Sequence, residues 1–143
     1  MQHKHYVGYE IKALSNLLRR KIWSPADHPQ EMLSEIDGVL IGYLCHNKGQ
    51  EIYQKDLEQT FCIRSSTASR LLKRLEDAGL IRRSTGARDA RLKQITPTPR
   101  AEALHQEAQQ RIAAAEATLT KGLSREEIDQ FLTTVEKLKR NLL

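Results

Sequence analysis

Cysteine is scarce in this chain of 143 residues, because Cys45 and Cys62 are the only two. Two thiols cannot supply the disulfide framework of a small secreted domain, so we expect a reducing compartment and a cytoplasmic protein. Long apolar runs are also missing. The start, MQHKHYVGYEIK, has no apolar core of signal-peptide length, and no stretch approaches the ~18 apolar residues that span a bilayer. The sequence therefore predicts neither a signal peptide nor a membrane partner.

Motifs of catalysis and cofactor binding are missing as well. The chain has no glycine-rich phosphate loop, no nucleophile elbow and no carboxylate pair with an evident role. His3 and His5 could hold a metal ion together, but no cluster of histidines, cysteines and acids has the spacing of a zinc site. We therefore expect no enzyme, no catalytic residue, no cofactor and no metal site.

Positive charge is in moderate excess and unevenly distributed. Lysine and arginine number 23 against 18 acids, which gives a net charge of +5. The excess is concentrated in residues 82–93, which hold five bases and one acid: Arg82, Arg83, Arg88, Arg91, Lys93 and Asp89. A local concentration of this kind favours an anionic partner more strongly than the net charge does.

Apolar periodicity predicts mainly helical structure. Spacings of three and four indicate helices over residues 6–23 and 65–78, and a short helix carries Leu57 and Phe61. A further helix is predicted over residues 30–49, and because its middle, 39–45, is apolar nearly all round, we expect it to be the buried central helix. Two strands around TGARDA predict a hairpin. A long helix follows Thr98 as its N-cap, and a last helix begins at the capping box Ser124–Glu127. The outer helices carry apolar stripes that this small domain leaves uncovered, which suggests pairing with a second chain.

The helix predicted over residues 65–78 has two contrasting faces. Ala68, Leu71, Leu72 and Leu75 form an inward stripe at positions i, i+3, i+4 and i+7. The opposite face is polar and basic: Ser66, Arg70 and Lys73, flanked by Ser69 and Arg74. Small hydroxyl residues let a helix approach a groove closely, and arginine or lysine can reach base edges and phosphates. We therefore predict the recognition helix of a helix-turn-helix, placed in the major groove of double-stranded DNA.

The basic hairpin predicts a wing beside this helix, over the neighbouring minor groove. Arginine suits that narrow and negative groove, so Arg91 is the candidate to enter it. Asp89, two residues earlier, could hold the Arg91 guanidinium in a bidentate pair. Because strand residues alternate faces, at most one of Arg82 and Arg83 should point directly at DNA.

At these residues the sequence resembles the MarR family of bacterial winged-helix regulators. The resemblance rests on QKDLEQTFCIRSSTASRLLKRLEDAGLI (54–81), on DARLKQITPT (89–98) and on GLSREEIDQFLTTVEKLKRNL (122–142). It implies a single domain over 1–143, with a winged helix-turn-helix over 31–98 and helical dimerisation regions over 1–23 and 99–143. Two departures are visible: Ala90 stands where a basic residue is frequent, and Pro97 stands where leucine is usual, which predicts a looser strand end.

The resemblance implies a homodimeric, effector-responsive repressor on a pseudo-palindromic operator. The sequence is equally compatible with a transcriptional activator, and it does not identify the small-molecule effector. Trp23, Tyr43 and His46 could line its pocket or could be ordinary packing residues. The predicted DNA-binding residues come from the helix and the wing: Ser65, Ser66, Thr67, Ser69, Arg70, Lys73, Arg74, Arg83, Arg88, Asp89 and Arg91.

Two alternatives stay open at this point. Cys45 fits a small core residue, and Cys62 lies just before the recognition helix, so either thiol could in principle sense oxidants. A winged-helix module that binds an acidic protein instead of DNA is the rival function. Aromatic or apolar anchors on the exposed helix face would favour it, and that face holds serine, arginine and lysine instead.

Overall fold

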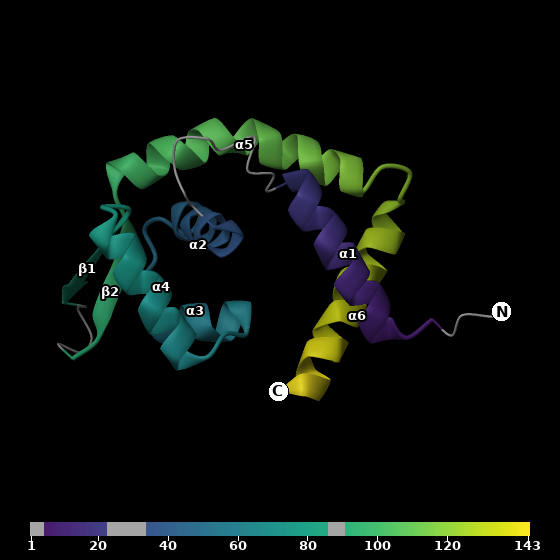
Figure 1. The fold of residues 1–143 in the computed structure, drawn as a ribbon, viewed down its shortest axis with the longest axis horizontal. Helices are drawn as coiled ribbons and strands as arrows, with labels where there is room; N and C mark the ends of the chain where they lie inside the picture. Colours follow the sequence, from purple (N-terminus) through teal and green to yellow (C-terminus); the bar gives the residue numbers. More distant parts are fainter. Residues whose placement is uncertain (1–4, 23–33, 86–90) are drawn as a thin grey trace. The chain divides into compact units, whose positions relative to one another are not determined.

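The computed structural model describes residues 5–22, 34–85 and 91–143. These residues form six helices and two strands in the predicted order (Figure 1). They are α1 (Val7–Ile22), α2 (Glu35–His46), α3 (Gln54–Phe61), α4 (Ser65–Asp77), β1 (Ile81–Thr85), β2 (Lys93–Pro97), α5 (Pro99–Leu119) and α6 (Arg125–Leu142). The two strands pair antiparallel. The predicted fold class, mainly helical with a small hairpin wing, is therefore confirmed.

The chain divides into two compact units, 1–109 and 110–143. The first unit contains α1 to α4, the hairpin and the first half of α5. Its core is apolar and comes from α2, α3, α4, the hairpin and the start of α5: Leu40, Ile41, Leu44, Ile52, Leu57, Leu71, Leu72, Leu75, Leu80, Ile81, Ile95 and Ala101. Removing these side chains from water is the main favourable contribution to folding of this unit.

Helix α2 supplies the centre of that core, as its apolar run predicts. Leu40, Ile41 and Leu44 are buried, whereas Val39 at the edge of the run remains partly exposed. Asp37 is also buried, although its helix is otherwise apolar at buried positions. Ser34 and Asp37 begin the helix with a capping box, in which the Ser34 backbone N–H donates to Asp37 Oδ2 at 3.0 Å.

Backbone hydrogen bonds join β2 to the residues before α3 and extend the pairing of the two strands by one residue pair. Ile95 N–H donates to the Ile52 carbonyl at 2.7 Å, so the extended residues before α3 border the sheet. Pro97 is the last residue of β2, opposite Ile81. Pairing continues beyond it, because Thr98 N–H donates to the Leu80 carbonyl at 3.1 Å. This bond secures the strand end that the proline was expected to loosen.

Thr98 connects the end of α4 to the start of α5. Its hydroxyl donates to the Gly79 carbonyl at 2.7 Å and accepts from Ala101 N–H at 3.3 Å, which caps α5 as the sequence predicts. Gly79 follows α4 with a φ of +73°, a left-handed conformation that glycine adopts without steric cost. One threonine therefore satisfies backbone groups at the end of one helix and the start of the next.

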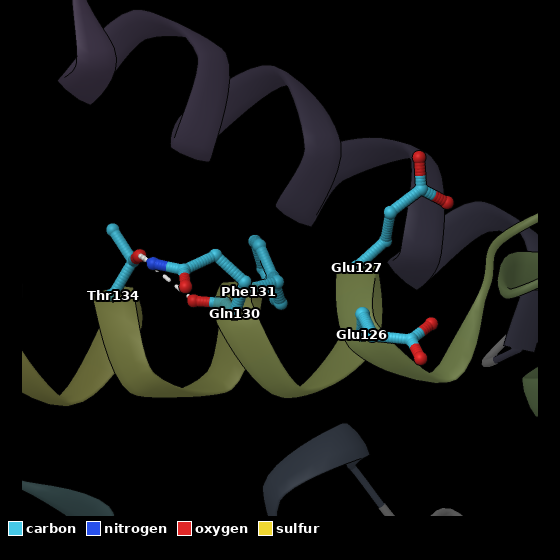
Figure 2. Close-up of a pocket in the computed structure, with 5 residues that line it drawn as sticks. All are labelled: Glu126, Glu127, Gln130, Phe131 and Thr134. Carbon is cyan, nitrogen blue, oxygen red and sulfur yellow. Dashed lines mark hydrogen bonds between the residues drawn. The ribbon is translucent and has the colours of Figure 1, made fainter.

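The second unit contains the end of α5 and α6. Within α6, every residue of which is described, no side chain is buried, and Phe131 and Leu132 are 56% and 55% exposed. A hollow on this helix is lined by Glu126, Glu127, Gln130, Phe131 and Thr134 (Figure 2). In the first unit, α1 likewise exposes Tyr9, Ile11 and Leu17. Both outer helices therefore present apolar surface to solvent.

No described helix is both long enough and apolar enough to cross a membrane.

A histidine pair lies where α2 packs on α5. The rings of His46 and His105 meet edge to face, with centroids 4.9 Å apart. His105 is buried, and its Nε2 has no hydrogen-bond partner among the described residues. Burial, and secondarily the neighbouring His46, lower the pKa of His105.

The His105 shift predicts a loss of stability in acid. In the unfolded chain the His105 imidazole becomes protonated as the pH falls below about 6.5. In the folded chain it becomes protonated only at a lower pH. Unfolding free energy should therefore fall as pH drops through about 6.5 toward the folded pKa. His105→Leu should remove this part of the pH dependence in denaturation curves between pH 7.5 and 5, and His5→Gln at an exposed position is the control. Equal pH dependence in His105→Leu and the unaltered chain would contradict the assignment.

Candidate nucleic-acid interface

Helix α4 has one buried and one exposed face, as its periodicity predicts. Ala68, Leu71, Leu72 and Leu75 are each 5% exposed or less and join the core. The opposite face is polar and exposed: Ser65, Ser66, Ser69, Arg70 and Lys73. Thr67 is half-buried. The core therefore holds the helix against the domain while a row of hydroxyl and basic groups faces outward.

The start of α4 is held by α3. Gln54 Nε2 donates to Ser69 Oγ at 2.9 Å and to the Ser65 carbonyl at 3.3 Å. At the N-cap, the Arg64 side chain makes no capping hydrogen bond within the described residues. The first-turn N–H groups of a helix attract anions such as phosphate. The start of α4 therefore offers free backbone N–H groups and the hydroxyl groups of Ser65, Ser66 and Thr67, and Gln54 holds it in place.

The cations on the exposed face differ in how they are engaged. Lys73 Nζ lies 3.7 Å from Asp77 Oδ2, and both side chains are well exposed. A pair of this kind is worth little in water, so it does not hold Lys73 away from a partner. Arg70 is exposed in the middle of the face. Both side chains can therefore reach a ligand laid along α4.

Arg74 lies on the flank of α4 and contacts α2. Its Nη2 donates to Asp37 Oδ1 at 2.5 Å and to Ser34 Oγ at 3.2 Å. The Asp37 side chain is 2% exposed, whereas that of Arg74 is 53% exposed. The sequence placed Arg74 beside the reading face, and the structure adds a buried carboxylate as its partner.

Arg83 and Arg82 occupy opposite faces of β1. Arg83 lies opposite the buried Ile95 in the sheet register, so its side chain turns toward the helices. Its guanidinium donates to both oxygens of Glu76 on α4, at 3.1 and 3.4 Å. Arg82, which was left out of the predicted DNA-binding residues, is exposed. The alternation predicted for this pair is present, and Arg83 is the inward member.

The wing contributes Arg91, which is exposed just before β2. Arg91, Arg83 and Lys93 help to line a hollow that also includes residues of α3 and the core residue Leu72. Figure 1 shows the hairpin beside α4. The other two predicted wing residues, Arg88 and Asp89, lie outside the described residues, so the Asp89–Arg91 pair stays a prediction.

Three residues of this region were missed by the sequence analysis. Asp37, Gln54 and Glu76 each hold a side chain of the predicted site. The capping-box spacing of Ser34 and Asp37 could have drawn attention to the carboxylate. No sequence signal connects it to Arg74, 37 residues away, because that contact depends on how α2 packs against α4.

The two cysteines lie in different environments. Cys45 is half-buried, and burial, followed by the nearby Glu102 carboxylate, raises the pKa of its thiol. Because the thiolate is the reactive form, this shift disfavours oxidation at Cys45. Cys62 is exposed at the end of α3 in a left-handed conformation, with φ of 53°. Its Sγ donates weakly to the Gln59 carbonyl at 3.8 Å.

Two of the predicted effector-pocket residues pack against side chains of the first unit. Tyr43 meets Phe61 edge to face with ring centroids 5.4 Å apart, and His46 meets His105. Trp23 lies outside the described residues. Across the residues that the structure describes, no three histidines, cysteines or acids gather as a metal site would require.

Comparison with known proteins gives two findings. Residues 43–93 match the model of the MarR family. This range includes α3, α4 and β1, and therefore most of the candidate interface.

Solved structures extend the similarity to nearly the whole chain. The transcription regulator MarR from Oenococcus oeni PSU-1 is 29% identical, with a TM-score of 0.82 over 94% of this chain and 99% of that one. S. aureus MepR in its DNA-binding conformation is 26% identical, with a TM-score of 0.86 over 97% and 100%. A MepR–DNA complex from S. aureus is 25% identical, with a TM-score of 0.81 over 96% and 99%. The resemblance predicted from the sequence is thereby confirmed.

Proposed function

We propose that this MarR-family chain is a sequence-specific transcriptional regulator that binds double-stranded DNA as a homodimer. The observation that carries the proposal is the exposed face of α4. Serine, arginine and lysine side chains project from a helix whose other face is locked into the core. A helix of this kind fits the major groove, and a basic hairpin beside it suits the neighbouring minor groove. The similarity to MepR, which has been solved with DNA, supports this assignment.

The residues divide between reading and positioning. Ser65, Ser66, Thr67 and Ser69 would let the start of α4 approach the DNA closely and donate to phosphates. Arg70 and Lys73 would contact base edges or phosphates inside the groove. In the wing, Arg91 would enter the minor groove, with Arg88 beside it and Asp89 holding its guanidinium. No residue is assigned a catalytic role, and a regulator of this kind acts in the cytoplasm, where bacterial DNA lies.

The homodimer would be built from the outer helices. Phe131 and Leu132 on α6, and Tyr9, Ile11 and Leu17 on α1, expose apolar surface. Exposed apolar stripes on helices are typical of surfaces that another chain covers. All the residues that line the hollow around Phe131 belong to α6 (Figure 2), and in the dimer a second chain would cover them. Two-fold symmetry then predicts half-sites about one helical turn, ~10 bp, apart.

Phe131→Glu should weaken the dimer. A carboxylate at this position would lose its hydration when the interface closes, and burying an unpaired charge is strongly unfavourable. Size-exclusion chromatography with light scattering should show the mass moving from two chains toward one at micromolar concentration. Thr133→Glu, at an exposed position of the same helix outside this hollow, adds the same charge and is the control. A dimer as stable as the unaltered one in Phe131→Glu would contradict this interface.

Regulation would follow from a difference in affinity. A small-molecule effector that binds better to a dimer with displaced recognition helices would lower DNA affinity by that difference. The same scheme gives a repressor if the operator overlaps a promoter.

The dependence of binding on salt tests the proposal against the rival protein-binding module. Binding of a fluorescent random duplex pool should weaken steeply and linearly in log Kd against log salt, because phosphate contacts release counterions. A slope near zero, or no binding at low salt, would contradict DNA binding and favour an acidic protein partner.

A further inference from the structure

Asp37 is the only buried acid among the described residues, and it lies beneath the flank of α4. One carboxylate oxygen, Oδ2, accepts from Ser34 N–H at 3.0 Å within its own helix. The other, Oδ1, accepts from Arg74 Nη2 at 2.5 Å on the recognition helix. The same nitrogen donates to Ser34 Oγ at 3.2 Å. The first turn of α2 therefore presents both an acid and a hydroxyl to a single guanidinium.

A buried carboxylate without a cation partner would destabilise the fold, so the arrangement in which Arg74 contacts Asp37 is strongly favoured. Arg74 reaches Asp37 from α4, and the remainder of its side chain is exposed. Pairing with a carboxylate cancels the charge that Arg74 would otherwise offer to a phosphate. The guanidinium is thus well placed to hold the helix and poorly placed to add net attraction for DNA.

The opposite flank of α4 is held as well. Ser69 accepts from Gln54 on α3, and Glu76 accepts from Arg83 on β1. Contacts on both flanks oppose rotation of α4 about its axis, and the buried leucine stripe holds its depth. Rotation matters for recognition because it moves Ser66, Arg70 and Lys73 across the groove.

We propose that Asp37 is a positioning residue for DNA reading, which holds Arg74 and thereby fixes the rotation of α4. Arg74, by this assignment, serves recognition through Asp37 and makes no phosphate contact of its own. This role rests on the proposed function. It reassigns a residue that the sequence alone grouped with the DNA contacts.

The test compares Asp37→Asn, Arg74→Gln and the double variant with Lys73→Gln, which removes an exposed cation of the same helix and is the control for a lost phosphate contact. Asp37→Asn keeps the size of the side chain and an acceptor for Ser34 N–H, and circular dichroism spectra establish that each variant is folded. Affinity is measured for a duplex selected by the unaltered chain and for a scrambled duplex, over a series of salt concentrations.

Each single variant should bind the selected duplex about tenfold more weakly, and binding to the scrambled duplex should be nearly unchanged. The double variant should lose no more DNA affinity than the weaker-binding single variant, because the two substitutions remove the same contact. The salt slope should stay that of the unaltered chain in Arg74→Gln and fall by about one in Lys73→Gln, because only the second change removes a phosphate contact.

A slope reduced by about one in Arg74→Gln would overturn the proposal, because it would identify a direct phosphate contact. Additive losses in the double variant, or unchanged affinity in both single variants, would overturn it too. An unaltered chain that prefers no sequence would instead contradict the proposed function, and this role with it. The unaltered chain is measured first, which keeps the two failures distinct.

Discussion

Leu72→Ala is expected to lower the free energy of unfolding by about 2–5 kcal/mol. Leu72 is 1% exposed and lies in the core directly beneath the recognition face. Truncation removes buried methyl groups and leaves a cavity that the neighbouring side chains fill only in part. A single small domain is stable by only about 5–15 kcal/mol, so this change should loosen or unfold the winged helix and abolish specific DNA binding.

Chemical denaturation followed by circular dichroism measures this loss directly. Leu92→Ala is the matched control, because Leu92 is 48% exposed and lies in the wing. Its truncation should cost well under the Leu72 value, about 0.5 kcal/mol, as is usual for surface substitutions. A loss in Leu72→Ala as small as that in Leu92→Ala would contradict the placement of the α4 stripe in the core.

Arg70→Ala is expected to reduce discrimination between bases by about 1–3 kcal/mol, which is about 5- to 150-fold in affinity. Arg70 lies at the middle of the exposed face of α4, and a bidentate contact from arginine to guanine is the commonest specific contact in the major groove. The loss should be confined to particular base pairs inside each half-site. Unlike Leu72→Ala, this substitution should leave the stability of the fold nearly unchanged.

Competition binding with duplexes that carry single base changes measures this effect. Arg125→Ala removes the same charge from the first turn of α6, outside the proposed interface, and serves as the control. Equal losses in the two variants would mean that Arg70 contributes only general electrostatic attraction. An Arg70→Ala protein that discriminates bases as well as the unaltered chain would refute its role in reading.

The helices and the core could be predicted because they depend on local periodicity. The stripe of Ala68, Leu71, Leu72 and Leu75 repeats at helical spacing, and it is buried as expected. The caps at Thr98 and Ser124 were likewise predictable, since an N-cap side chain bonds to backbone groups within its own first turn. Such interactions are encoded within a few residues of sequence.

The contacts that position the site depend on strand register and helix packing, which local sequence patterns do not specify. Alternation along β1 indicates that Arg82 and Arg83 face opposite ways, but only the register that pairs Arg83 with Ile95 determines which one turns inward. The Arg74–Asp37 contact likewise joins two helices whose packing no local pattern specifies. Sequence reasoning therefore found the cations of the interface and could not separate those that face outward from those that hold the structure.

Selection from a random duplex pool at ~150 mM salt tests sequence-specific reading by a symmetric dimer most directly. The purified full chain is mixed with the pool, and the retained duplexes are sequenced. A symmetric dimer should enrich an inverted repeat whose half-sites lie about one helical turn apart. Retention of duplexes without any enriched sequence, or of a single half-site without its symmetric mate, would contradict this expectation.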